Sequence, residues 1–313
     1  GAPVSFLMVQ SGGAPDLWAE QLEHVARLNA EGANLVPQVA GRPGGMLIGA
    51  ATYHGLMRRP TFRRLEQECS YDELLIELRK PEVKAAILAE QDLPADPNRQ
   101  YESIADNMAY MFERLFVLGD PPDYEPTRDR SIAGIAEATG TDPWEVLYDV
   151  IASGALLLGA FTNYANVSQD HLRVMLEHPD TVVGLSDGGA HVRFICDASM
   201  PTYLLTHWTR DRTRGDTIPL ETIVRKQAAL TAATIGLDDR GTIEVGKRAD
   251  LNVIDLDNLR LEPPFPSDDL PAGGRRILQP AHGYVATIVH GVVVRRDDVD
   301  TGARPGRLVR AAH

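Results

Sequence analysis

Hydrophobic and polar positions alternate along much of the chain in a way that predicts strands separated by helices. Residues 4–10 form an apolar run typical of a buried strand, and residues 34–39 form a second. Between them, a helix beginning near Asp16 places apolar side chains on one face, those of Trp18, Leu22, Val25 and Ala26. The same order resumes later, with apolar strands at 155–161 and 181–185. Strands joined by helices predict a parallel sheet, and a (β/α) barrel is the commonest large solution.

The stretch from about residue 50 to residue 130 interrupts this order with consecutive helices. Helical patterns are present at 71–78, 82–91 and 101–115, and turns rich in proline join them. We therefore expect a helical insertion, or a lid, over about residues 50–130 beside the barrel.

Beyond Gly236 the pattern changes to that of short strands and turns. Strand-like or hairpin-like segments follow one another at 241–246, 249–255, 284–289 and 292–295. The last two are separated by His290-Gly291, a two-residue spacing typical of a β-hairpin. The sequence thus predicts a barrel portion over residues 1–236 and a small β module over residues 237–313.

Composition and charge exclude several classes of protein. The 313 residues include 31 Lys and Arg against 44 Asp and Glu, so the formal net charge is −13. This excess of acidic side chains repels a phosphate backbone, and we expect no nucleic-acid partner. No apolar run is long enough to cross a bilayer, so we expect no membrane span. The two cysteines, Cys69 and Cys196, form no CxxC pair. This excludes a disulfide scaffold and fits a reducing, cytoplasmic location.

Candidate chemistry gathers at the end of the strand at 181–185. Asp187 follows this strand directly, and Gly188-Gly189 allows the backbone to turn sharply toward a ligand. A carboxylate there can accept a proton from water and pass it to a leaving amine. The alternative is a structural role, in which the Asp187 side chain caps the next loop. His191 could bind substrate, orient Asp187 or ligate a metal, although a lone histidine is more often a hydrogen-bonded structural residue.

Three segments resemble a known family. They are TVVGLSDGGAH at 181–191, DRGTIEVGKRADLNVID at 239–255, and GARPGR near the end; DRSIAGIAEATGTDPWEVLYDVI at 129–151 adds to them. Together they resemble the amidohydrolase superfamily, and within it the N-acyl-D-amino-acid deacylases. The resemblance covers roughly residues 130–310. It implies the fold class α/β. The chain would supply strands five to eight of a metal-dependent (β/α)8 TIM barrel with a helical insertion, followed by the C-terminal piece of a small β-sandwich.

The resemblance also implies a role for Asp187 and a metal. Asp187 matches the carboxylate that ends the family's eighth strand, where it acts as general acid/base and metal ligand. The family's His-x-His pair occurs nowhere in the 313 residues, and Gln10 and Gln38 stand where histidine ligands are expected. Glutamine is a poor zinc ligand. The divalent metal, by default zinc, is therefore expected to take most of its ligands from outside this chain, or to have been lost. His54 could be an alternative ligand or a plain loop residue.

Further polar residues near predicted strand ends are candidates for substrate binding. Asn163 and Tyr164 follow the strand at 155–161, and Gln10 and Gln38 remain candidates as pocket residues. Arg42 and Arg193 could each hold a substrate carboxylate by a bidentate contact, or could equally be surface residues. These assignments rest on position along the chain alone.

Two hypotheses from different classes follow. The preferred one is a metal-dependent amidohydrolase that cleaves a C–N bond of a small molecule, such as an N-acyl amino acid. The alternative is a binding or scaffold subunit that keeps the fold without hydrolysis. Four βα units do not close an eight-stranded barrel, so we expect the remainder to precede Gly1, in the same protein or as a second polypeptide. A homo-oligomer is compatible with either hypothesis.

Overall fold

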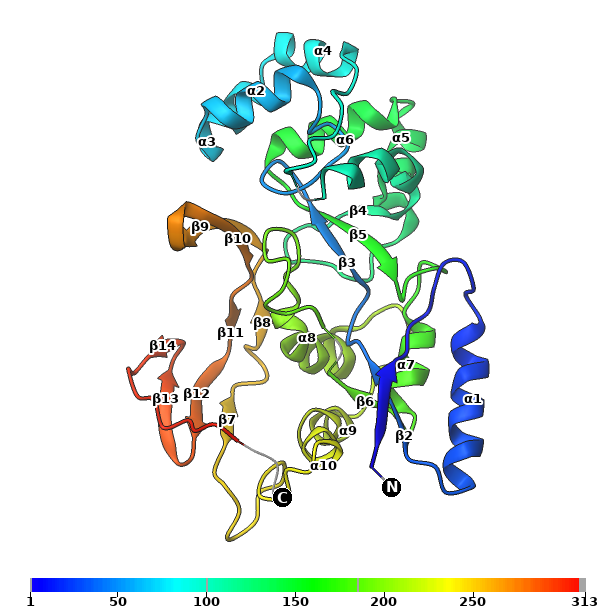
Figure 1. Ribbon diagram of the computed structural model, residues 1–313, viewed down its shortest axis with the longest axis vertical. Coiled ribbons are helices and arrows are strands. Elements are labelled where there is room, and N and C mark those ends of the chain that lie inside the picture. The colour runs from blue at the N-terminus through cyan, green and yellow to red at the C-terminus, as the bar shows by residue number, and fades with distance from the viewer. Residues whose placement is uncertain (1, 100, 185, 310–313) are drawn as a thin grey trace.

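A three-stranded parallel sheet forms from the first, second and last of the predicted barrel strands (Figure 1). The structure is a computed structural model that describes residues 2–99, 101–184 and 186–309. The sheet has the order β1-β2-β6, from β1 (Val4–Leu7), β2 (Leu35–Val39) and β6 (Val182–Val183). Both pairings are parallel, and Gln38 of β2 lies opposite Leu7 on one side and Val182 on the other.

Helices connect and flank these strands, as the alternating pattern predicts. Helix α1 (Leu17–Ala30) buries Leu22 and Val25, and α7 (Asp170–Glu177) buries its apolar face. Both helices contact β2. The side-chain amide of Asn29 near the end of α1 donates to the carbonyl of Leu35 and accepts from its N–H, which fixes the turn into β2. The strand–helix–strand order therefore sets the carboxyl ends of the parallel strands side by side.

The predicted strand at 155–161 does not join this sheet, and its assignment as a parallel barrel strand is wrong. It forms β5 (Leu157–Thr162), which lies between β3 (Gly44–Ile48) and β4 (Leu115–Val117) and pairs antiparallel with both. Close approach explains the pairing with β3. A Cβ on Gly45 would lie 1.8 Å from the carbonyl oxygen of Gly159, so glycine is needed there. β2 consequently pairs with β6 directly.

The structure places helices in the region where the sequence predicts an insertion. They are α2 (Pro60–Glu68), α3 (Tyr71–Leu78), α4 (Pro81–Ala89) and the 3₁₀ segment η1 (Glu102–Arg114). Ser70 and Glu73 form a capping box at the start of α3, in which each side chain accepts the other's backbone N–H. Helices α5 (Ile132–Thr139) and α6 (Pro143–Ser153) pack onto this group and share with it a second hydrophobic core.

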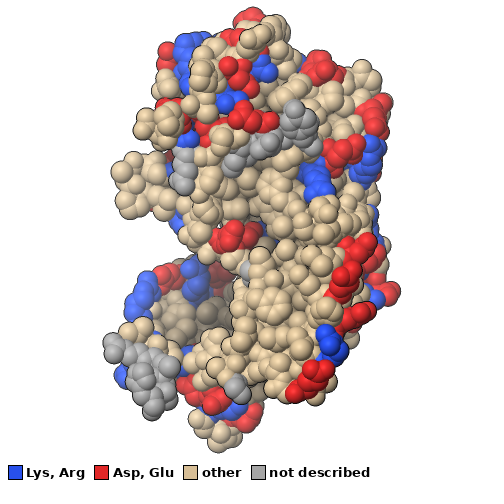
Figure 2. Space-filling view, turned by 45° about the vertical axis from the view of Figure 1, so that its right-hand side comes forward, with Lys and Arg blue, Asp and Glu red and all other residues tan. Residues whose placement is uncertain are grey.

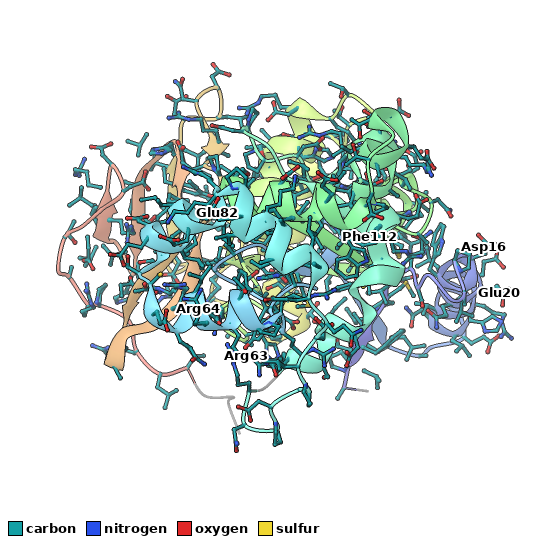
Figure 3. The ribbon with its side chains drawn as sticks, turned by 90° about the horizontal axis from the view of Figure 1, so that it is seen from above. Asp16, Glu20, Arg63, Arg64, Glu82 and Phe112 are labelled. Carbon is teal, nitrogen blue, oxygen red and sulfur yellow. The ribbon has the colours of Figure 1, made fainter. Side chains whose placement is uncertain are left out.

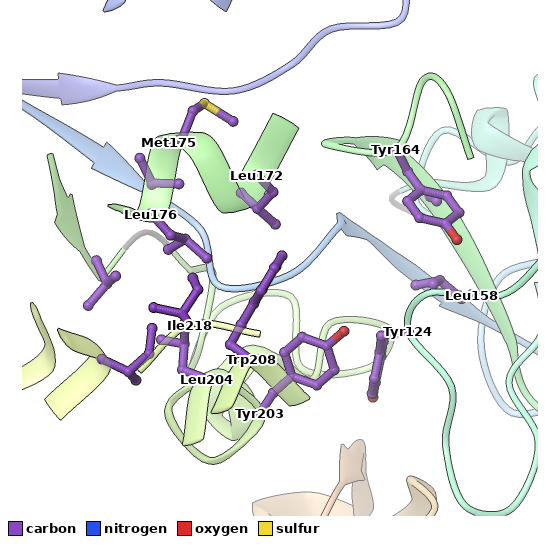
Figure 4. Close-up of a cluster of buried hydrophobic side chains, with 14 of the residues drawn as sticks. Tyr124, Leu158, Tyr164, Leu172, Met175, Leu176, Tyr203, Leu204, Trp208 and Ile218 are labelled. Carbon is purple, nitrogen blue, oxygen red and sulfur yellow. The ribbon is translucent and has the colours of Figure 1, made fainter. Parts of the chain in front are cut away.

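Short helices lead from the parallel sheet to the carboxyl-terminal strands. They are α8 (Met200–Thr206), the π-helical turn η4 (His207–Asp211), α9 (Leu220–Arg225), the π-helical turn η5 (Lys226–Leu230) and α10 (Thr231–Thr234). Trp208 of η4 is fully buried, and its indole N–H donates to the carbonyl of Gly41 at 2.7 Å. Figure 4 shows Trp208 extending toward Leu172 of α7, Leu204 beside Ile218, and Tyr203 beside Tyr124, all within one buried hydrophobic cluster. This core includes side chains of β2 and β6 and of the helices α1, α7 and α8.

The carboxyl-terminal strands form a small β module, part of which the sequence predicts. A four-stranded antiparallel sheet has the order β14-β13-β12-β7, from β7 (Leu251–Ile254), β12 (Tyr284–Val289), β13 (Val292–Arg296) and β14 (Val299–Asp300). Two pairs add to it: β8 (Arg260–Leu261) with β11 (Ala281–His282), and β9 (Phe265–Leu270) with β10 (Gly274–Leu278). His290 and Gly291 have φ of 52° and 75°, as the predicted hairpin turn requires. Residues 241–246 form turns and not strands, so the predicted hairpin-like segment there is wrong.

Charged side chains cover the outer surfaces of the fold. Figure 2 shows acidic side chains gathered along one flank, in keeping with the net charge of −13. Seen from above, Arg63 and Glu82 lie on the helical insertion, whereas Asp16 and Glu20 lie at the opposite side beside α1 (Figure 3). In the part of the chain that the structure describes, no helix combines the length and the apolar character needed to span a bilayer.

Candidate functional site

A pocket of about 280 Å³ opens at the carboxyl end of the parallel sheet. Its lining comes from the last residue of β1 and those after it, from the segments that follow β2 and β6, and from β3 and β5. These residues are Leu7, Val9, Ala40, Gly44, Gly45, Met46, Phe161, Thr162, Ser186, Asp187, Ile195, Asp197 and Met200. Most of the lining is apolar, and Asp187 and Asp197 are its two ionisable residues. A carboxylate at the edge of an apolar pocket is a suitable setting for proton transfer.

Asp187 lies where the sequence places it, after β6 and at the pocket. The neighbouring Leu185 lies outside the described residues, so the predicted strand at 181–185 is seen as Val182–Val183. The Asp187 side chain is exposed, and its carbonyl accepts the N–H of Ala190, which closes a tight turn. The Asp187 backbone N–H donates to Oδ2 of Asp197 at 3.2 Å.

Arg42 lies close to the pocket, but its guanidinium is already engaged. The residue is 3% exposed, and its Nη2 donates to the carbonyl of Cys196 at 2.7 Å. Nη2 also lies 3.4 Å from Oδ1 of Asp197, and Nη1 donates to Ser199 Oγ at 2.9 Å. Asp197 is a site residue that the sequence reasoning missed. In the sequence, Asp197 is marked only by its place in the short segment Asp197-Ala198-Ser199, between the Asp187 loop and α8.

His191 and Arg193 face the helical insertion and are not part of the pocket lining. The His191 ring stacks on Phe194, and its Nδ1 lies 2.9 Å from the Tyr101 hydroxyl. The Arg193 guanidinium donates to Glu66 of α2 at 2.9 Å. Both side chains therefore join the loop after β6 to the insertion. Their predicted contacts with substrate stay predictions that this geometry does not support.

The remaining candidates make hydrogen bonds within the fold and do not line the pocket. Gln10 is fully buried; its side-chain oxygen accepts the N–H of Ala165 at 2.9 Å, and its backbone N–H donates to Asn163 Oδ1 at 2.8 Å. The Tyr164 hydroxyl donates to a main-chain carbonyl and accepts from Arg214 at 3.1 Å, and burial raises its pKa. Gln38 donates to Ser5 Oγ at 2.8 Å. The structure does not bring these four side chains to the pocket.

Comparison with known proteins fixes the family of the chain. A family model described as the amidohydrolase family matches residues 18–295. The chain belongs to the amidohydrolase family. The resemblance found in the sequence is thereby confirmed.

Relatives of this amidohydrolase chain include deacylases. A curated D-aminoacylase of Alcaligenes xylosoxydans xylosoxydans is 25% identical over 269 residues, which are 82% of this chain and 48% of the relative. A solved D-aminoacylase, described for its binuclear metal centre, matches 96% of this chain and 48% of its own, with 19% identity and a TM-score of 0.46. The N-acyl-D-glutamate deacylase of Bordetella bronchiseptica, solved with zinc and a phosphonate inhibitor, is 17% identical. The match covers 98% of this chain and 49% of the deacylase, with a TM-score of 0.48. The amidohydrolase chain thus spans about half the length of the curated relative.

The described residues of this amidohydrolase do not form a metal site. Within 2–99, 101–184 and 186–309, no three His, Cys, Asp or Glu side chains gather closely enough to hold an ion. Both oxygens of Asp197 already meet donors, from Asp187 and Arg42. His54 is fully buried beside Phe62, and its Nδ1 accepts the N–H of Leu56, so it does not reach the pocket. Two pocket carboxylates are too few for the tetrahedral ligand set of zinc.

Two buried histidines predict a loss of stability in mild acid. Burial lowers the pKa of His54 and of His171 from 6.5 to about 4. Between these values the unfolded chain binds more protons than the folded chain, so stability rises with pH across this window and falls on acidification. Each histidine contributes about 1.4 kcal/mol per pH unit within it.

We expect urea unfolding of the full-length protein at pH 7, 6 and 5 to show this slope. His171→Gln should reduce the dependence by about one proton. A slope that is identical in His171→Gln and wild type would contradict the assignment of His171.

Proposed function

We propose that the protein containing this chain hydrolyses a C–N bond of a small amide, with an N-acyl amino acid as the substrate class. The observation that carries the proposal is the placement of Asp187 beside an apolar pocket at the carboxyl ends of β1, β2 and β6, in a member of the amidohydrolase family. Reactive groups of α/β barrels lie at this end of the strands. The curated D-aminoacylase relative supports the choice of substrate class.

The proposed chemistry uses Asp187 as a general acid/base. The carboxylate accepts a proton as a water molecule adds to the amide carbonyl, which gives a tetrahedral intermediate. The protonated carboxyl then donates this proton to the departing nitrogen, and the C–N bond breaks to release an acid and an amine. Asp187 is restored to its charged form. The apolar lining, including Met46 and Phe161, would hold the hydrocarbon part of the substrate and exclude water from it.

A divalent metal, by default zinc, is proposed from the family resemblance, although the described residues do not by themselves complete a site for it. Asp187 is the one ligand that the resemblance assigns to this chain. Its other ligands would come from outside the residues described. β1 offers a surface for such a partner segment: it is the outer strand of its sheet, and Val4 and Leu7 are 58% and 54% exposed.

The glutamines at the predicted ligand positions limit the number of ions. Gln10 and Gln38 make amide hydrogen bonds to neighbouring groups, so we expect at most one tightly held divalent ion per full-length protein. Elemental analysis by mass spectrometry after dialysis measures this number. Two equivalents retained through dialysis would show that the ligand positions are misassigned.

A binding or scaffold role without hydrolysis is the second candidate, and it is motivated by Gln10 and Gln38 at the positions where histidine ligands are expected. The two are separated by incubating the full-length, metal-supplemented protein with N-acyl amino acids of both configurations. Release of free amino acid supports the hydrolase. Calorimetric binding of one of these compounds without release of amine supports the binding role and overturns the hydrolase.

A further inference from the structure

The loop that carries Asp187 is tied to a buried ion pair. The Asp187 backbone N–H donates to Asp197 Oδ2 at 3.2 Å, and the other oxygen of Asp197 lies 3.4 Å from Arg42 Nη2. The side chains of Arg42 and Asp197 are 3% and 12% exposed. Asp197 therefore bridges the exposed loop and an interior guanidinium, and it does so on the wall of the pocket.

Arg42 is fixed by contacts other than Asp197. It donates to the carbonyl of Cys196 at 2.7 Å and to Ser199 Oγ at 2.9 Å, and its guanidinium carbon lies 3.9 Å from the centroid of the Tyr124 ring. A guanidinium held on two sides in this way cannot rotate freely to follow its carboxylate partner. The Asp197 carboxylate therefore lies against a guanidinium whose orientation is restricted by its other contacts.

Strand β10 anchors the same segment from its other side. The N–H of Ile277 donates to the carbonyl of Val192 at 2.8 Å, and Cys196 Sγ lies 3.7 Å from the carbonyl oxygen of Ile277. The segment from 192 to 199 is thus held between β10 and the residues after β2. The Asp187 turn is the exposed part of this arrangement, and the bond to Asp197 connects it to the fixed part.

We propose that Asp197, held by Arg42, is a positioning residue that fixes the Asp187 carboxylate for proton transfer. The inference rests on the proposed function, and it reassigns Arg42 from binding a substrate carboxylate to orienting Asp197. A general acid/base must stay within hydrogen-bond reach of the proton that it moves. A displacement of about 1 Å can lower a rate by about 10²-fold, so the acceptor that holds the Asp187 turn affects turnover without touching substrate.

Steady-state kinetics of the full-length protein test this role. Asp197→Ala removes the acceptor, and we expect kcat to fall about tenfold or more while KM changes by less than about threefold. Asp197→Asn keeps one oxygen that can accept the Asp187 N–H but turns its NH2 group toward Arg42, so we expect it to restore only part of kcat. Asp238→Ala, in the exposed turn after α10, is the matched control and should behave as wild type. An Asn variant no better than Ala in a folded protein would overturn the proposal.

Hydrogen–deuterium exchange of the peptide containing Asp187 tests the contact without any turnover. We expect exchange about tenfold faster in Asp197→Ala than in wild type, an intermediate rate in Asp197→Asn, and wild-type exchange in Asp238→Ala. If Asp197→Ala does not fold, Arg42→Lys replaces it, since a lysine cannot make the same forked contacts, and faster exchange is again expected. Unchanged exchange in a folded variant would overturn the positioning role. Absent amide hydrolysis in wild type with this exchange pattern would reject the proposed function alone.

Discussion

Replacing Arg212 by methionine is expected to lower the free energy of unfolding by about 3–5 kcal/mol. The side chains of Arg212 and Glu125 are 0% and 3% exposed, and two parallel hydrogen bonds of 3.1 and 3.0 Å join them. Although burial opposes it, hydrogen bonds from His207 and Arg212 lower the pKa of Glu125 to about 2. Without the guanidinium, Glu125 would be a buried carboxylate with too few donors. Chemical denaturation at pH 7 measures the loss.

A matched surface pair provides the control for Arg212. Arg173 and Glu177 form an exposed contact of 2.8 Å on α7, and Arg173→Met should change stability by only about 0.5 kcal/mol. The double variant Glu125→Gln/Arg212→Met should be more stable than Arg212→Met alone, because no buried charge is then left unpaired. A loss below about 1 kcal/mol in Arg212→Met would contradict the importance assigned to this pair.

Asp187→Asn is expected to lower kcat by about 10²-fold or more in the full-length, metal-supplemented protein. Asparagine preserves the shape of the side chain and the backbone N–H that binds Asp197, but it neither accepts nor donates the transferred proton. Because the backbone contact is kept, the fold and KM should change little. Initial rates over a range of substrate concentration separate kcat from KM.

The same substitution at Asp238 gives the matched control for Asp187. Asp238→Asn removes one exposed carboxylate from the turn after α10 and leaves the pocket untouched, so wild-type kinetics are expected. A folded Asp187→Asn variant with wild-type turnover would refute the role of Asp187 as acid/base, whatever the family of the chain.

The local sequence pattern was sufficient to predict strands that are flanked by a clear helix or turn motif. The apolar runs that became β1 and β2 are joined by a helix with one buried face, and His290-Gly291 specified the turn between β12 and β13. The run at 155–161 shows the limit of this reasoning. A continuous apolar run indicates a buried strand but not the direction of its partners, and the pairing with β3 depends on the close approach of Gly45 to Gly159.

The candidate site was predictable only in part, because some of its contacts join residues that are far apart in the sequence. Asp187 follows a strand and precedes two glycines, a local signal, and the structure places it at the pocket. Arg42 and Asp197 are separated by 155 positions, and their contact arises from tertiary packing alone. The sequence alone suggested that Arg193 could bind a substrate carboxylate. In the structure it already pairs with Glu66 of the helical insertion, a contact that the local sequence does not reveal. Local sequence indicates which groups are present, whereas the fold decides which of them are free.

Hydrolysis of an amide at this pocket can be tested by following the oxygen atom of water into the product. Full-length protein supplemented with zinc is incubated with N-acyl amino acids in ¹⁸O-labelled water, and the released acid is analysed by mass spectrometry. We expect one ¹⁸O in the carboxylate of the released acid, formed by wild type and Asp238→Asn and about 10²-fold more slowly by Asp187→Asn. Binding of these compounds without formation of labelled acid by wild type would contradict the proposed hydrolysis.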